Sequence, residues 1–147
     1  MNEPLTPRLK QEEPSTDLVT TVFVYGTLKS GGPVRGLDSY PVDHRELQGK
    51  AKTTYPDYHM FDLGAFPGVL KNGEHHIQGE VWEVDEQTAL ELDMIEGYPE
   101  FYNKEKTETT QGRAWMYFLP GEQYRDYLKN GESDNIAVEQ DTLIWKA

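Results

Sequence analysis

The sequence predicts an α+β fold in which a small mixed sheet or barrel carries a few flanking helices. About six short segments have the β-branched and aromatic composition of strands, whereas one segment has clear helical spacing and another favours a short helix. These segments do not alternate regularly between strand and helix. That order argues against a doubly wound parallel sheet and for a mixed sheet with helices at its margin.

The length of 147 residues fits one domain with one sizeable core. Residues 1–17 hold three prolines and many charges, and Leu5 and Leu9 are their only larger apolar residues. We therefore expect a loosely ordered leader over 1–17, followed by a single domain over 18–147.

The first strand is predicted in LVTTVFVYG, because β-branched and aromatic residues dominate it and no polar residue other than threonine interrupts it. Such a run favours a central position in the sheet. The stretch 30–45, rich in glycine and proline, reads as a loop. Residues 45–64 suggest short strands that break at Gly49 and again at Tyr55-Pro56-Asp57.

The stretch AFPGVLKNGEHHIQGEVWEV has the pattern of a β-hairpin. Asn72-Gly73 is a strong turn signal, and a strand runs from there through Val84. In that strand Val81 alternates with polar neighbours, whereas Trp82 and Val84 share the opposite side.

The spacing then becomes helical, with Ala89, Leu92 and Ile95 at steps of three residues. Asp85 is a suitable N-cap, and Gly97 is well placed to end the helix. We therefore expect a helix between these two residues.

Two further strands are predicted in FYNKEKTETT and GRAWMYFLP, with a turn at Gln111-Gly112. A short helix is expected over Glu122–Lys129. The remaining C-terminal residues are predicted to be irregular and anchored by apolar side chains at 143–145.

Composition excludes several classes of function. The formal net charge of −12 repels phosphate backbones, so we expect no nucleic-acid partner. The chain has no cysteine, which excludes disulfides, thiolate metal sites and a cysteine nucleophile. No apolar stretch has the roughly 18 residues of a membrane span, and the first residues do not resemble a secretory signal. We expect a cytoplasmic protein that makes no membrane contact.

The loop FVYGTLKSGG raises the question of a ligand, because glycines after a strand often expose backbone N–H groups. Gly26 and Gly31 have the spacing of a phosphate loop, but Gly32 and Pro33 stand where that loop needs lysine and serine or threonine. The dinucleotide pattern and the serine nucleophile elbow are also missing. The four histidines lack the spacing of a helical zinc site, so no metal or cofactor is predicted.

After these exclusions, a carboxylate side chain is the remaining candidate for a catalytic group. Among 26 acidic residues, Glu96 differs because it ends an apolar helix face and aromatic residues follow it closely. Burial there would raise the pKa of its carboxyl and make it a better base near neutral pH. The alternative is an ordinary exposed residue in the last helical turn.

Two motifs together resemble those of the gamma-glutamylcyclotransferase-like superfamily. VFVYGTLKSGG is similar to the Y-G-[ST]-L loop of that superfamily, and LDMIEGYPEFYNKEK is similar to its second motif, in which a glutamate-glycine pair is followed by a tyrosine. AFPGVL and GRAWMYF also look like family elements. The resemblance covers roughly residues 22–119.

The resemblance implies a small mixed barrel with a few flanking helices and an enzyme that releases 5-oxoproline and a free amine or amino acid from a gamma-glutamyl amide. Glu96 would match the catalytic carboxylate. Tyr102 would match a pocket tyrosine. The loop residues that would hold the gamma-glutamyl group are Tyr25, Gly26, Thr27 and Leu28.

Two departures bear on the substrate. Lys104 stands where relatives often have arginine. If that position touched substrate, the planar guanidinium group with its several donors would be replaced by a single compact ammonium charge. Lys29 follows the loop where the glutathione-specific branch usually has an aromatic residue. The gamma-glutamylamine branch is therefore the better match, and the partner would be a small gamma-glutamyl molecule without a cofactor. Relatives are often dimers, so the resemblance is compatible with a homodimer without fixing the oligomeric state.

Other interpretations stay open. The same fold could serve as a non-catalytic binding module for an amino-acid-like ligand, or as a related lyase or hydrolase acting on a different acyl group. Tyr25 could pack in the core with its hydroxyl at the rim. Trp115 and Tyr117 lie on a predicted strand and are expected in the core.

Overall fold

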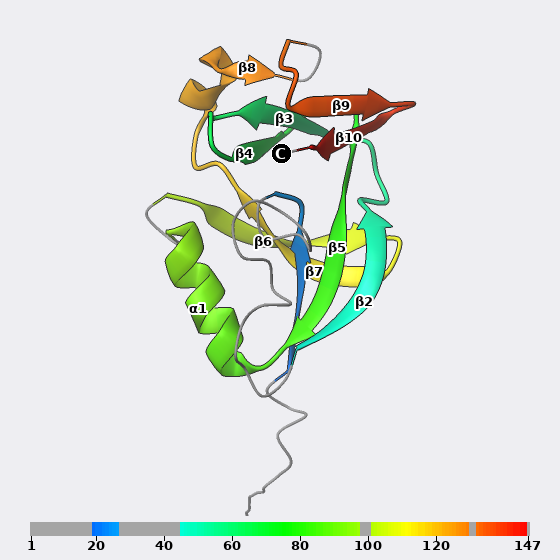
Figure 1. The fold of residues 1–147 in the computed structure, drawn as a ribbon, viewed down its shortest axis with the longest axis vertical. Coiled ribbons are helices and arrows are strands. Elements are labelled where there is room, and N and C mark those ends of the chain that lie inside the picture. The colour runs from blue at the N-terminus through cyan, green and yellow to red at the C-terminus, as the bar shows by residue number, and fades with distance from the viewer. Residues whose placement is uncertain (1–18, 27–44, 98–100, 130–131, 147) are drawn as a thin grey trace, which may run out of the picture.

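The computed structural model describes residues 19–26, 45–97, 101–129 and 132–146, and it shows a mixed α+β fold (Figure 1). The larger sheet has the strand order β6-β7-β1-β5-β10-β9, and β2 pairs with β5 beside this path. The β1–β7 and β5–β10 pairs are parallel, whereas the other pairs are antiparallel. The strands of this sheet are Thr20–Val24 (β1), Arg45–Lys52 (β2), His76–Val84 (β5), Asn103–Thr109 (β6), Gly112–Phe118 (β7), Ile136–Glu139 (β9) and Thr142–Trp145 (β10).

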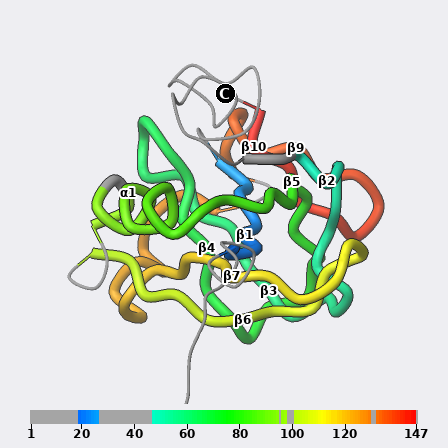
Figure 2. Tube along the Cα trace, turned by 90° about the horizontal axis from the view of Figure 1, so that it is seen from below, coloured from blue at the N-terminus to red at the C-terminus, as the bar shows by residue number. Residues whose placement is uncertain are grey.

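A smaller sheet has the order β4-β3-β8, formed by Pro67–Lys71 (β4), Tyr58–Asp62 (β3) and Leu128–Lys129 (β8). The described residues contain one α-helix, Glu86–Glu96 (α1), and a 3-10 turn, Glu122–Asp126 (η3). Figure 2 shows the strands curling into a half-barrel with α1 to one side of them. None of the helices among the described residues reaches the length and apolarity of a membrane span.

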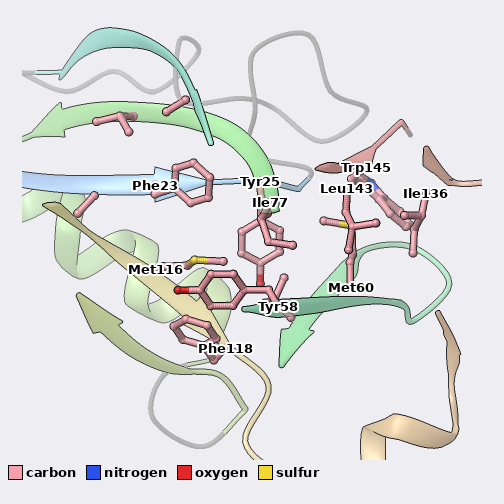
Figure 3. Packing of buried hydrophobic residues seen from close by; sticks show 14 residues of the cluster. Phe23, Tyr25, Tyr58, Met60, Ile77, Met116, Phe118, Ile136, Leu143 and Trp145 are labelled. Carbon is pink, nitrogen blue, oxygen red and sulfur yellow. The ribbon is translucent and has the colours of Figure 1, made fainter. Parts of the chain in front are cut away.

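The first strand is central, as predicted, because β1 lies between β7 and β5. Its side chains alternate between two apolar clusters. Phe23 belongs to the first cluster, which fills the space between the two sheets (Figure 3). Val22 and Val24 belong to the second cluster, which includes Leu92 of α1. The strand therefore supports the core and the helix together.

The strand β5 contributes apolar side chains to both clusters, whereas its polar residues, among them Glu80 and Glu83, are half-buried. Val81 lies in the first cluster, whereas Trp82 and Val84 lie in the second, as their alternation predicted.

The helix has the predicted ends. The Asp85 side chain accepts a hydrogen bond from the Thr88 backbone N–H over 2.8 Å. Gly97 takes the left-handed conformation with φ 72° and donates its N–H to the carbonyls of Asp93 and Met94. Local capping chemistry thus fixes where α1 stops, and so where its last residue, Glu96, is placed.

The predicted hairpin was wrong in its pairing. The Asn72-Gly73 turn is present, but β4 pairs with β3, and β5 pairs with β1, β2 and β10. Gly73 packs so closely on the start of β3 that an added Cβ would collide with the Tyr58 carbonyl group. A side chain at this position would therefore collide with the backbone of β3.

Three further expectations were also wrong. Gly49 does not break β2, because the strand passes through it with an irregularity of register between Leu47 and Gly49. The C-terminal residues are not irregular, since β9 and β10 form an antiparallel pair. The segment predicted as one short helix is the η3 turn followed by β8. The leader predicted over 1–17 and most of the loop at 30–45 lie outside the described residues.

Candidate active site

Glu96 ends α1 with its carboxyl group largely buried, although the residue as a whole is half-buried. Burial disfavours the charged form and raises the pKa of this carboxyl to about 7. No described lysine or arginine lowers it again. A carboxyl with this pKa exchanges a proton readily at neutral pH, which is what a general acid and base needs.

Two buried tyrosines lie within electrostatic reach of Glu96. The pKa of Tyr25 is raised well above its ordinary value by burial, then by the nearby Tyr102 and Glu96. The pKa of Tyr102 is also raised, by burial, then by Glu96 and Tyr124. Both hydroxyls therefore remain protonated at neutral pH, and Tyr25, Tyr102 and Glu96 lie within electrostatic reach of one another.

Backbone carbonyls orient both hydroxyls. The Tyr25 hydroxyl donates to the Tyr117 carbonyl over 2.8 Å, and the Tyr102 hydroxyl donates to the Pro67 carbonyl over 2.7 Å. Tyr25 also belongs to the first apolar cluster, where Figure 3 shows it beside Ile77. Tyr25 therefore packs in the core, as one interpretation of the sequence expected, and also lies near Glu96.

The start of the glycine loop lies against the smaller sheet. A Cβ added to Gly26 would lie 2.9 Å from the ring of Pro67, the residue whose carbonyl binds Tyr102. A side chain at this position would push against the support of that tyrosine. Thr27 and Leu28 lie outside the described residues. Of the six predicted site residues, the structure thus places Tyr25, Gly26, Glu96 and Tyr102 around one region, and their roles stay predictions.

A second polar cluster, around Asp93, was not predicted from the sequence. Asp93, one turn before Glu96, accepts hydrogen bonds from the Lys104 ammonium at 2.9 Å to each carboxylate oxygen and from the Tyr117 hydroxyl at 2.6 Å. From the sequence, Lys104 was weighed only as a possible substrate contact. The structure instead gives its ammonium a carboxylate partner within the protein, Asp93. The spacing of Asp93 from Glu96 was a usable signal, because residues three apart lie near one another on a helix surface.

Histidines do not gather with carboxylates in the described part of the chain, where no group of three or more potential metal ligands is found. His59, His75 and His76 are half-buried, in agreement with the interpretation of half-packed side chains. His44 lies outside the described residues.

The comparisons with known proteins identify the family. The model of the family described as gamma-glutamyl cyclotransferase, AIG2-like, matches residues 22–137. The chain is 42% identical over 96 residues to the "Putative gamma-glutamylcyclotransferase" of Vibrio cholerae, covering 65% of this chain and 78% of that relative. It is 30% identical over 96 residues to the gamma-glutamylcyclotransferase family protein YtfP of Escherichia coli, covering 65% and 79%. The protein belongs to the AIG2-like gamma-glutamyl cyclotransferase family.

Solved structures agree with the fold. An AIG2-like protein from Mus musculus superimposes with a TM-score of 0.66 at 22% identity, over 80% of this chain and 89% of that chain. The solution structure of the Escherichia coli protein ytfP gives a TM-score of 0.54 at 28% identity, over 70% and 85%. The predicted superfamily and fold class are therefore confirmed.

Proposed function

We propose that this protein releases 5-oxoproline and a free amine from a gamma-glutamyl amine, with Glu96 as the general acid and base. The observation that carries the proposal is the buried carboxyl of Glu96, whose pKa is raised to about 7 beside Tyr25 and Tyr102. Family membership supports the same reaction class.

The reaction is an intramolecular ring closure. The α-amine nitrogen of the gamma-glutamyl group attacks its own γ-carbonyl carbon, and a five-membered lactam forms. The bond from that carbon to the leaving amine nitrogen then breaks. Because nucleophile and carbonyl belong to one molecule, folding and orienting the chain can contribute roughly 7–11 kcal/mol in favourable cases.

Proton transfer is the remaining requirement. The α-amine is largely protonated at neutral pH and must lose a proton before it attacks, and the leaving nitrogen must gain one. Glu96 can accept the first proton and donate it to the second site, which typically contributes about 10²–10⁴-fold in rate. A pKa of about 7 suits both steps, since the carboxyl is populated in both forms.

The residues of the loop that follows β1 would hold the substrate. In this proposal Tyr25, Gly26, Thr27 and Leu28 bind the α-carboxylate and α-amine through backbone groups, and Tyr102 lines the pocket. The proposed steps use only these residues and Glu96. A cytoplasmic location remains a prediction, and the oligomeric state stays open.

Turnover tests the proposal directly. The protein is incubated with gamma-glutamyl amines, gamma-glutamyl amino acids and glutathione, and 5-oxoproline is measured by mass spectrometry beside Glu96→Gln. We expect product from the gamma-glutamyl amines and its loss in the variant. A folded wild-type protein that forms no product from any member would favour the binding module, and ligand-induced thermal shifts with the same panel would then identify the ligand class.

A further inference from the structure

The cluster around Asp93 joins three elements of the fold. Asp93 lies on α1, Lys104 on β6 and Tyr117 on β7. The side chains of Asp93 and Lys104 are only 17% and 21% exposed, so both charges are largely removed from water. The Lys104 ammonium also lies 5.3 Å from the centre of the Trp115 ring. Lys104 is therefore held by a carboxylate and by an aromatic face.

The ion pair closes a short segment of chain on itself. Glu96 and Tyr102 both belong to the segment that begins at Asp93 and ends at Lys104. Within it, the Gly97 N–H caps the helix on the Asp93 carbonyl, and the Phe101 N–H donates to the Gly97 carbonyl. The two candidate residues thus lie between two anchored ends.

Tyr117 connects this segment to the third candidate residue. Its hydroxyl donates to Asp93 over 2.6 Å, while its backbone carbonyl accepts from the Tyr25 hydroxyl over 2.8 Å. Tyr117 is therefore bonded to both Asp93 and Tyr25.

A net gain in stability is a weak explanation for such a pair. Removing two charges from water offsets most of their attraction, and apolar side chains of similar volume often stabilise a fold as well. The ion pair differs from an apolar contact in its directionality, because two oxygens and one ammonium fix the end of the helix in one orientation.

We propose that Asp93, Lys104 and Tyr117 form a positioning unit that fixes Glu96 and Tyr102 relative to Tyr25. In this proposal the three residues do not touch the substrate and act through Glu96, Tyr102 and Tyr25. Its effect on turnover rests on the proposed function, whereas its effect on the Glu96 carboxyl can be measured whether or not the protein is an enzyme.

Lys104→Met is the main variant, because methionine keeps much of the apolar stem and removes the charge. Lys106→Met is the matched control, since Lys106 lies on the same strand with its ammonium 5.4 Å from the same Trp115 ring. Lys104→Arg is the rescue variant. Tyr117→Phe removes one hydrogen bond to Asp93 without changing any charge. Thermal melting establishes that each variant folds.

In the turnover assay, we expect Lys104→Met to lower kcat by about 10- to 100-fold with KM changed less than about threefold, because small displacements of a reacting group are costly. Tyr117→Phe lowers kcat by a smaller factor. Lys104→Arg retains most of kcat, and Lys106→Met retains all of it. A folded Lys104→Met protein with unchanged kcat overturns the proposal.

The Glu96 carboxyl gives a second readout, by ¹³C NMR of glutamate-labelled protein assigned through Glu96→Gln. Among the described residues, Tyr25 and Tyr102 are titratable groups that interact electrostatically with Glu96, while Asp93 lies one turn earlier on α1 and is paired with Lys104 of β6. If Lys104 acted on Glu96 only as a nearby positive charge, Lys104→Met would raise the pKa of Glu96 above its present value of about 7. If Lys104 positions the helix end, its loss admits water and lowers this pKa toward that of an exposed glutamate.

We therefore expect a lower Glu96 pKa in Lys104→Met and in Tyr117→Phe, and an unchanged one in Lys106→Met. A raised or unchanged pKa in both variants overturns the proposal even if wild-type protein is inactive on every amide. Conversely, a lowered pKa in an inactive wild-type background supports the positioning unit and rejects the proposed reaction.

Discussion

The Tyr102 hydroxyl donates a hydrogen bond to the Pro67 carbonyl across 2.7 Å, and this bond ties the segment after α1 to the first residue of β4. Pro67 also lies against Gly26, at the start of the glycine loop. One residue of the smaller sheet thus supports both predicted substrate-binding regions.

Tyr102→Phe removes that hydroxyl and leaves the Pro67 carbonyl without this donor. We expect unfolding free energy to fall by about 1 kcal/mol and kcat/KM to fall by about tenfold. Tyr58→Phe is the control, because the Tyr58 hydroxyl pairs with the Thr107 hydroxyl at 2.7 Å within the first apolar cluster. Urea denaturation and turnover are measured for both. Equal losses of activity in the two variants would show that Tyr102 acts through stability alone.

The pH dependence of turnover follows from Glu96. Its carboxylate form accepts the proton of the substrate amine, so kcat/KM should fall by about tenfold per pH unit below the pKa of the free enzyme. With the pKa at about 7, the break should lie near neutral pH. Initial rates from pH 5 to pH 9 locate it. A break near the pKa of an exposed glutamate, or a residual Glu96→Gln activity with the same break, would remove Glu96 from the role of base.

The same shift predicts how stability changes with pH. The folded-state pKa of Glu96 lies above its unfolded value, so the folded protein binds more protons between the two values, and Glu96 lowers stability as pH rises through about 7. Glu96→Gln removes this penalty. We expect its unfolding free energy, relative to wild type, to be about 1–3 kcal/mol higher at pH 8 than at pH 5. Urea denaturation at both values tests this, and an equal difference at pH 5 and pH 8 contradicts it.

Gly97→Ala tests the reversal of the chain after Glu96. Gly97 has φ 72°, and an added Cβ would lie 3.0 Å from the Cβ of Phe101. We expect a stability loss of about 1 kcal/mol together with lower kcat, because Glu96 is the preceding residue. Gly112→Ala is the control, since Gly112 has φ 98° with nothing within 4 Å of an added Cβ. It should lose stability but keep turnover. Reduced kcat in both variants would point to a general loss of folded protein.

The parts of the fold that local chemistry specifies could be predicted from the sequence. The two ends of α1 followed from Asp85 and Gly97, because capping requires few contacts beyond the helix itself. Glu96 was found for the same reason, since its apolar and aromatic neighbours are close in sequence. Its raised pKa agrees with that prediction.

Long-range pairing could not be predicted in the same way. Asn72-Gly73 correctly marked a break between two strands, with Asn72 at φ 67°, but β4 pairs with β3, and β5 pairs with β1, β2 and β10, segments that no local pattern connects. The importance of Asp93 was hidden for a similar reason. Its partners Lys104 and Tyr117 come from two other elements, and its spacing of three residues from Glu96 gave its place on the helix but not these partners.

The parallel pairing of β10 with β5 has a consequence for synthesis of the chain. Leu143 pairs with Ile77, far back in the sequence, and both are fully buried. While the ribosome is still extending the chain, this edge of β5 has no partner, and an unpaired apolar edge is a template for other nascent chains. This part of the sheet can therefore close only after β10 has been synthesised, and a chaperone that shields β5 until Trp145 has emerged would raise the yield of native protein.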